Sequence, residues 1–205
     1  MAIRAALFDM DGTIYDSGID WRRLRREIDL PSDGRPILEQ LADAPDEVRN
    51  RGTRLLHEAE ALGASDGALI EGTEELLAML HRRGIPCALI TNNSRRSVET
   101  VLSKHELRFD VVFSRDDGPS KPAPDLFLAA LARLGVPPAD ALVIGDAHLD
   151  AIAASAAGIP RVVLVGTPEW MKEHLPKGLN HHEADDLYET REIVSRILDG
   201  SADVR

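Results

Sequence analysis

The chain has 205 residues, and its 43% hydrophobic and 29% charged residues form an ordinary globular mixture that can bury a core without disulfides. Its 35 Asp and Glu residues outnumber its 24 Lys and Arg residues, and the formal net charge of −11 argues against nucleic acid and anionic membranes as partners, because both require a basic face. A single cysteine excludes an internal disulfide, and no apolar run reaches the ~20 residues that span a bilayer, so we expect a cytoplasmic protein.

Five short apolar runs recur along the chain, and none shows the alternation of a half-buried strand. Such runs are typical of strands that are covered on both faces of a parallel sheet. They are Ile3–Phe8, Ile85–Ile90, Val111–Phe113, Ala141–Ile144 and Val162–Val165. The predicted helices that alternate with them are Thr73–Arg83, Ser94–His105, Pro124–Leu134, Leu149–Ala157 and Leu187–Leu198. This alternation predicts an α/β fold with a doubly wound parallel sheet of five strands.

The stretch between Tyr15 and Leu69 breaks the alternation, because it contains no strand-like run. Prolines and glycines divide it into three predicted helices, which are Trp21–Asp29, Pro36–Ala42 and Pro45–Leu62, with Gly63 ending the last. We therefore expect a core formed by residues 1–15 and 70–205 and a small helical insert formed by residues 16–69. Two short hinges, near Ser17-Gly18 and Gly63–Gly67, would join the insert to the core.

Polar residues follow four of the predicted strands. The residues are Asp9, Asp11, Gly12 and Thr13 after the first strand, Thr91 and Asn92 after the second, Lys121 after the third, and Asp146 and Asp150 after the fourth. One aspartate at a strand end is most often only a helix cap. However, the carboxyl ends of parallel strands share one edge of the sheet, so the whole set is expected to converge there.

Four carboxylates at one edge require a cation. Two unit charges ~4 Å apart repel by about 4 kcal/mol at an effective dielectric constant of ~20. An all-oxygen site suits a hard ion, and Mg²⁺ is the usual choice when the substrate is a phosphate. Together with Lys121, that ion would attract a phosphoryl group. An aspartate without a neighbouring His or Cys indicates a carboxylate nucleophile.

With these motifs the sequence resembles the haloacid dehalogenase superfamily over Ala2–Gly166, and it is most similar to the phosphoglycolate phosphatase and β-phosphoglucomutase branch. The insert between the first and second motifs is similar to the helical type 1 cap of that family. The resemblance implies that Asp9 is the nucleophile and a metal ligand, and that Asp11 is the general acid–base with a backbone carbonyl on the metal. It implies further that the phosphoryl group is bound by Gly12, Thr91, Asn92 and Lys121, and the metal also by Asp146 and Asp150.

The resemblance implies a Mg²⁺-dependent phosphatase that acts on a small phosphorylated metabolite through an aspartyl-phosphate, as a monomer or homodimer. Asp11 favours phosphoryl transfer, because the dehalogenases of this family lack the second aspartate and the metal. Three alternatives stay open: a phosphomutase of the same family, a phospho-accepting signalling domain, and a non-catalytic binding protein.

Two other groups of polar residues have a structural interpretation. The first insert helix carries a basic run on what we expect to be its solvated face, with contact to an anionic substrate as the alternative. This run is Arg22, Arg23, Arg25 and Arg26. His181 and His182 are expected in a solvated loop and not in a metal site, because neighbouring histidine side chains point apart.

Overall fold

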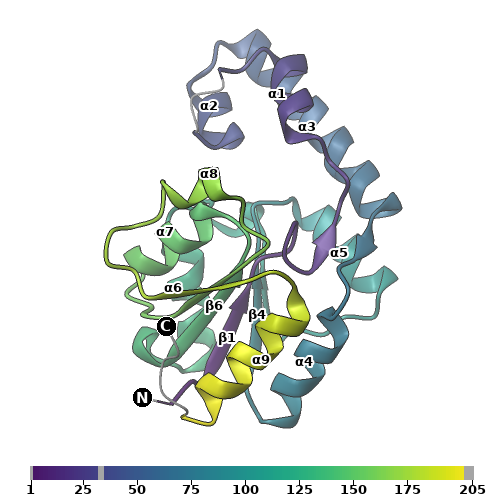
Figure 1. Cartoon of the computed structure of the whole chain (residues 1–205). Coiled ribbons are helices and arrows are strands. Elements are labelled where there is room, and N and C mark those ends of the chain that lie inside the picture. The colour runs from purple at the N-terminus through teal and green to yellow at the C-terminus, as the bar shows by residue number, and fades with distance from the viewer. Residues whose placement is uncertain (1, 32–34, 201–205) are drawn as a thin grey trace.

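The computed structural model describes residues 2–31 and 35–200, which form a sheet flanked by helices with a helical insert above its upper edge (Figure 1). Within these residues the main sheet has six parallel strands in the order β5-β4-β1-β6-β7-β8. The strands are β1 (Ala5–Phe8), β4 (Cys87–Ile90), β5 (Val111–Phe113), β6 (Ala141–Gly145), β7 (Val162–Val165) and β8 (His181–Ala184). The doubly wound α/β prediction is confirmed.

Helices cover both faces of this sheet, which explains why β1, β4, β6 and β7 are buried along their whole length. One face packs against α4 (Thr73–Arg82), α5 (Arg95–Lys104) and α9 (Leu187–Leu198), and the other against α6 (Asp125–Leu134) and α7 (His148–Ala156). Along β1, Ala6 and Phe8 face the first layer while Ala5 and Leu7 face the second. Continuous apolar runs therefore marked these strands correctly.

The predicted number of five strands is wrong, because His181–Ala184 forms a sixth, β8, parallel to β7. We expected His181 and His182 in a solvated loop. As the edge strand, β8 keeps three of its four residues partly or fully exposed, so its sequence lacks the apolar run by which the inner strands were recognised. Short one-turn elements also connect the main ones: η1 (Arg115–Asp117), η2 (Pro138–Asp140) and α8 (Glu169–Lys172).

The insert consists of α1 (Trp21–Ile28), α2 (Ile37–Asp43) and α3 (Asp46–Asp66). These helices bury a small core of their own, formed by Leu24, Ile28, Leu41 and Leu56. The long helix α3 rises from its contact with α5 and carries α1 and α2 above the sheet edge (Figure 1). A two-stranded antiparallel ribbon of β2 (Tyr15–Asp16) and β3 (Ala68–Leu69), too short to be recognised in the sequence, closes its base.

Helix α3 does not end at Gly63, as we expected, but continues to Asp66. A Cβ atom at Gly63 would lie 2.9 Å from the Ser17 Cβ atom and 3.0 Å from the Ser17 carbonyl oxygen. Glycine is therefore needed here for the close approach of the two chain segments that join insert and core. This requirement comes from tertiary packing, which a local helix-stop rule does not include. The insert boundaries at residues 16 and 69 stay a prediction.

Side chains of the core hold the C-terminal end of α3. The Tyr15 hydroxyl lies 3.1 Å from the Gly63 carbonyl oxygen and 2.9 Å from that of Ala64, and can donate its hydrogen bond to this pair. The Lys104 ammonium group donates to the carbonyl oxygens of Ser65 and Gly67, at 2.7 and 2.9 Å. The base of the insert is thus attached to the core by a dense set of contacts.

We expect Gly67→Ala to destabilise the protein by about 1–3 kcal/mol, the usual range for overpacking. A Cβ atom at position 67 would lie 2.4 Å from the Asp16 carbonyl oxygen, so the two connecting segments must separate. Urea unfolding measures the effect. The control is Ser65→Ala, which changes an exposed side chain nearby and should stay within about 0.5 kcal/mol of the native protein. An unchanged urea midpoint for Gly67→Ala would contradict the packing argument.

The basic run of α1 is exposed at Arg22, Arg23 and Arg26, as expected for a solvated face. Arg25 differs, because it is half-buried and donates to the Gln40 side chain at 2.7 Å and to the Arg35 carbonyl oxygen at 2.6 Å. Arg25 therefore ties α1 to the segment that leads into α2. Across the described part of the chain, no helix combines the length and apolar character needed to cross a membrane.

Candidate active site

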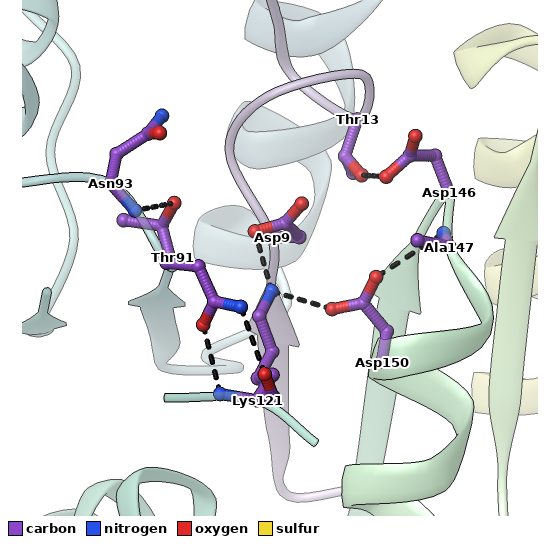
Figure 2. A network of polar contacts seen from close by, with 9 residues as sticks. Asp9, Thr13, Thr91, Asn93, Lys121, Asp146, Ala147 and Asp150 are labelled. Carbon is purple, nitrogen blue, oxygen red and sulfur yellow. Dashed lines mark hydrogen bonds and ion pairs between the residues drawn. The ribbon is translucent and has the colours of Figure 1, made fainter. Parts of the chain in front are cut away.

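Five of the predicted site residues gather at the carboxyl edge of the sheet (Figure 2), the edge above which the insert helices lie (Figure 1). Asp9, Thr91 and Asp146 directly follow β1, β4 and β6, which are neighbouring strands, and Asp150 lies in the first turn of α7. From β1 the chain adds β4 and β5 on one side and then β6, β7 and β8 on the other. Open α/β sheets bind ligands at the point where the strand order reverses in this way. Lys121 reaches the same place from the loop before α6.

Lys121 lies at the centre of the carboxylates. Its Nζ atom donates to Asp9 Oδ1 at 2.5 Å and to Asp150 Oδ1 at 2.6 Å (Figure 2). The Lys121 side chain is 3% exposed, and an ammonium group this deeply buried is costly unless it is paired. Burial alone would lower the pKa of Lys121, but the attraction of Asp150 and Asp9 exceeds that effect and raises it. Lys121 is therefore a fixed positive charge beside Asp9.

Asp9, Asp146 and Asp150 each offer an oxygen atom, and these three atoms all lie within 4.8 Å of one another. Burial raises the pKa of Asp9 to about 6, with Lys121 opposing and Asp150 adding to the effect. Burial and the charges of Asp9 and Asp150 also hold the pKa of Asp146 well above its usual range. One lysine leaves this group short of positive charge. A divalent cation with a preference for oxygen ligands fits these residues in both charge and donor chemistry.

The loop after β1 places Asp146. Gly12 has a φ angle of +84°, and a Cβ atom there would lie 2.3 Å from Asp146 Oδ2, so the loop can approach this carboxylate only with glycine. Thr13 is fully buried, and its hydroxyl group donates to Asp146 Oδ1 at a long 3.4 Å (Figure 2). Thr13 belongs to the first motif, but its sequence position alone did not reveal this contact with a residue 133 positions away.

The Asp11 carboxylate is not part of the three-aspartate group. Its Oδ1 atom accepts a hydrogen bond from the Ser17 backbone N–H at 3.1 Å, in the segment that leads to the insert. Burial raises the pKa of Asp11, the hydrogen bond from Ser17 lowers it, and the nearby Asp9 charge raises it further. The structure therefore places a carboxyl group with a raised pKa between the predicted nucleophile and the connecting segment.

Thr91 and Asn92 are held differently from each other. The Thr91 hydroxyl oxygen accepts from the Asn93 backbone N–H at 3.2 Å, which leaves its own proton for another acceptor. The Asn92 side chain bonds the backbone of Lys121, and binding of a phosphoryl group by Asn92 stays a prediction. Its Nδ2 atom donates to the Lys121 carbonyl oxygen at 2.9 Å, and its Oδ1 atom accepts from the Lys121 N–H at 2.8 Å. Asn92 thus fixes the loop that carries the central lysine.

The raised pKa of Asp9 predicts how pH and metal affect stability. The folded protein binds the Asp9 proton more tightly than the unfolded chain does, since its pKa is about 6 instead of 3.8. The stability of the metal-free protein therefore falls as pH rises from about 4 to 6, for this group alone. Mg²⁺ at about 100 times its Kd should raise the melting temperature at pH 7.5 by about 5–10 °C. The shift should be much smaller at pH 5, because protons compete with the ion.

Differential scanning fluorimetry at equal ionic strength measures both melting shifts, with Asp9→Asn as the variant that lacks this titration. Equal Mg²⁺-induced shifts at pH 5 and pH 7.5 would contradict the assignment of the ion to these carboxylates.

Comparison with known proteins identifies relatives that match most of the chain. A family model described as haloacid dehalogenase-like hydrolase matches residues 3–158. Phosphoglycolate phosphatase of Escherichia coli is 29% identical over 190 residues, covering 91% of this chain and 71% of that protein. Validoxylamine A 7'-phosphate phosphatase of Streptomyces hygroscopicus is 32% identical over 188 residues, covering 80% of this chain and 86% of that protein. The plasmid protein CbbY of Cupriavidus necator is 30% identical over 203 residues, covering 78% of each chain.

Solved structures with the same fold also match nearly the whole chain. A hydrolase from Pseudomonas syringae superposes with a TM-score of 0.78 at 22% identity, covering 95% of this chain and 99% of that one. This likeness confirms the fold alone. CbbY from Rhodobacter sphaeroides, in complex with phosphate, superposes with a TM-score of 0.68 at 27% identity, and the match covers 91% of this chain and 96% of that one. The predicted family resemblance is thereby confirmed.

Proposed function

The chain belongs to the haloacid dehalogenase-like hydrolases, and on this premise we propose that it is a Mg²⁺-dependent phosphatase of a small phosphorylated metabolite. One observation carries the proposal: Asp9, Asp146 and Asp150 meet around Lys121 in a buried site at the sheet edge. Relatives named as phosphatases of phosphoglycolate and of validoxylamine A 7'-phosphate support the same reaction class. Asp9, Asp146 and Asp150 would hold the ion, which supplies Lewis-acid stabilisation of phosphoryl oxygens when bound.

Asp9 is the proposed nucleophile. Its carboxylate oxygen attacks phosphorus in line with the leaving group, a new O–P bond forms, and the bond from phosphorus to the substrate oxygen breaks. Lys121 holds Asp9 through a charged hydrogen bond and provides positive charge beside the transferred phosphoryl group. The Thr91 hydroxyl proton, which the Asn93 contact leaves free, can be donated to a phosphoryl oxygen. The product of this step is an aspartyl-phosphate.

Asp11 is the proposed general acid and base. Its raised pKa favours the protonated form that must give a proton to the leaving alkoxide. The resulting carboxylate then takes a proton from the water molecule that attacks phosphorus, while the bond between phosphorus and the Asp9 oxygen breaks and releases phosphate and free Asp9. In this structure Asp11 is held by Ser17, so movement of the connecting segment would free it for the substrate. Closure of the insert would also exclude bulk water. We propose that the enzyme works in the cytoplasm as a monomer or homodimer.

A phosphate-release screen tests the proposal. Purified protein is incubated with Mg²⁺ and a panel that includes phosphoglycolate and several sugar phosphates, with Asp9→Asn as the blank. We expect metal-dependent phosphate release for at least one small substrate. Conversion of a sugar phosphate to its isomer without phosphate release would instead assign a phosphomutase. No turnover of any kind, with a stable phosphorylated Asp9, would assign a phospho-accepting domain.

A further inference from the structure

A buried ion pair joins the insert to the core next to the proposed phosphate-binding residues. Glu60 belongs to α3 of the insert, and Arg115 belongs to η1, which follows β5. The Arg115 Nη1 atom forms a charged hydrogen bond with Glu60 Oε1. The side chains are 9% exposed for Arg115 and 2% exposed for Glu60, so the pair is almost completely removed from solvent. A charged pair of this kind is costly to bury, which raises the question of what it does for the protein.

Arg115 also holds the segment that follows β4. Its Nη1 atom donates to the Asn92 carbonyl oxygen at 3.0 Å, and its backbone N–H donates to the Asn93 carbonyl oxygen at 3.2 Å. The same Nη1 atom therefore contacts an acidic residue of the insert and a backbone carbonyl of the proposed active site. Displacement of Arg115 would remove a partner from the peptide group between Asn92 and Asn93.

This peptide group controls two features of the site. Its carbonyl oxygen faces Arg115, while its N–H group donates to the Thr91 hydroxyl oxygen and so leaves the Thr91 proton free for a phosphoryl group. The Asn92 side chain, fixed on the same residue, holds both backbone polar groups of Lys121. Rotation of the peptide would misdirect the Thr91 hydroxyl and loosen Lys121.

We propose that Glu60 and Arg115 are positioning residues, which set the orientation of Thr91 and Lys121 for phosphoryl transfer. Because Glu60 belongs to the insert, this orientation depends on where the insert lies. This inference rests on the proposed phosphatase function. The pair is also poorly explained as a stabilising bridge alone. Glu60 Oε2 and Arg115 Nη2 are buried and have no hydrogen-bond partner among the described residues, which is unusual for a bridge that serves stability.

The test compares Glu60→Gln with the native protein on the best metabolite from the screen and on p-nitrophenyl phosphate. The isosteric change keeps the side-chain shape and removes the charge that holds Arg115. We expect kcat to fall about 10- to 100-fold, the effect of misplacing a reacting group by a fraction of an ångström to 1 Å, while KM changes less than about threefold. Inhibition by orthovanadate, which resembles the transition state, should weaken in parallel with kcat, and inhibition by inorganic phosphate should change little.

A double variant separates positioning from stability. Glu60→Leu with Arg115→Met replaces the pair by apolar side chains of similar size, which often restores or improves stability. We expect the double variant to melt within a few degrees of the native protein, while its kcat stays as low as that of Glu60→Gln. Recovery of both quantities would overturn the inference, as would native kcat in Glu60→Gln.

Glu58→Gln is the matched control. Glu58 lies on the same helix, is exposed, and pairs only at the surface with Arg54 at 3.2 Å. The Glu58→Gln variant should have the same kcat, KM and vanadate inhibition as the native protein. If the native protein itself releases no phosphate from any substrate, the proposed function fails. If it is active and Glu60→Gln is equally active, only the positioning inference fails.

Discussion

Replacing Asp9 with asparagine is expected to lower metal-dependent phosphate release by at least about 10³-fold, because the amide oxygen cannot form the aspartyl-phosphate. The carboxylate that shares Lys121 with it, Asp150, also accepts from the Ala147 N–H at 3.2 Å, so it is not free to substitute. The variant should still fold, since an asparagine oxygen can accept the hydrogen bond that Lys121 now donates to Asp9. Initial rates of phosphate release over a range of Mg²⁺ concentrations measure the loss.

Chemical trapping shows whether the loss is that of the nucleophile. Rapid quenching of the native enzyme with hydroxylamine should convert a phosphorylated Asp9 into a hydroxamate, detectable by mass spectrometry of the peptide that contains it. Asp9→Asn should give no hydroxamate there. Asp16→Asn is the matched control, because Asp16 belongs to β2 and its side chain accepts from the Gly18 N–H at 2.9 Å, at the surface. Its activity should stay near native. Full activity in Asp9→Asn would refute the proposed mechanism.

Replacing Lys121 with methionine is expected to reduce kcat/KM by about 10²- to 10³-fold, the usual cost of removing one charge that stabilises a transition state. A second effect concerns stability. Asp9 and Asp150 lose the ammonium group that each contacts, at 2.5 and 2.6 Å, and the carboxylates are left buried together without that cation. The metal-free variant should therefore melt below the native protein at pH 7.5.

The dependence of this difference on pH and metal identifies its cause. At pH 5 the melting difference should shrink, because Asp9, whose pKa burial raises to about 6, is then more often protonated and repels its neighbours less. Added Mg²⁺ should restore part of the stability at pH 7.5 without restoring kcat/KM. Lys172→Met is the control, because Lys172 pairs with Glu183 on the surface at 2.6 Å and should affect neither quantity by much. A difference that is equal at both pH values would point to lost packing instead of lost charge.

Several elements could be predicted from the sequence because their determinants are local or periodic. The inner strands were visible as apolar runs since both of their faces are buried, and the polar residues at their ends share an edge in any parallel sheet. The edge strand β8 and the ribbon of β2 and β3 were missed for a physical reason. They are short and partly exposed, and their formation depends on partners distant in sequence, so they carry no periodic signal of their own.

In the candidate site, too, some features of single residues could be predicted from the sequence and others could not. The types of Asp9, Thr91, Lys121 and Asp146, and their order along the chain, are enough to indicate phosphoryl-transfer chemistry. Asn92 belongs to that set, but its side chain binds Lys121, which is 29 residues away, and no local rule could assign this partner. The same holds for Glu60 and Arg115, which are 55 residues apart and would be read separately as ordinary surface charges.

The sequence by itself thus determined the kind of fold, the presence of a helical insert and the chemical inventory of the site. These three features depend on burial patterns and residue types, which are visible locally in the sequence. Only the tertiary structure decided the pairing of each side chain: Lys121 between Asp9 and Asp150, Asp11 on Ser17, and Glu60 on Arg115. Charge and hydrogen-bond interactions act over a few ångströms, so they are fixed only when distant segments are brought together in space.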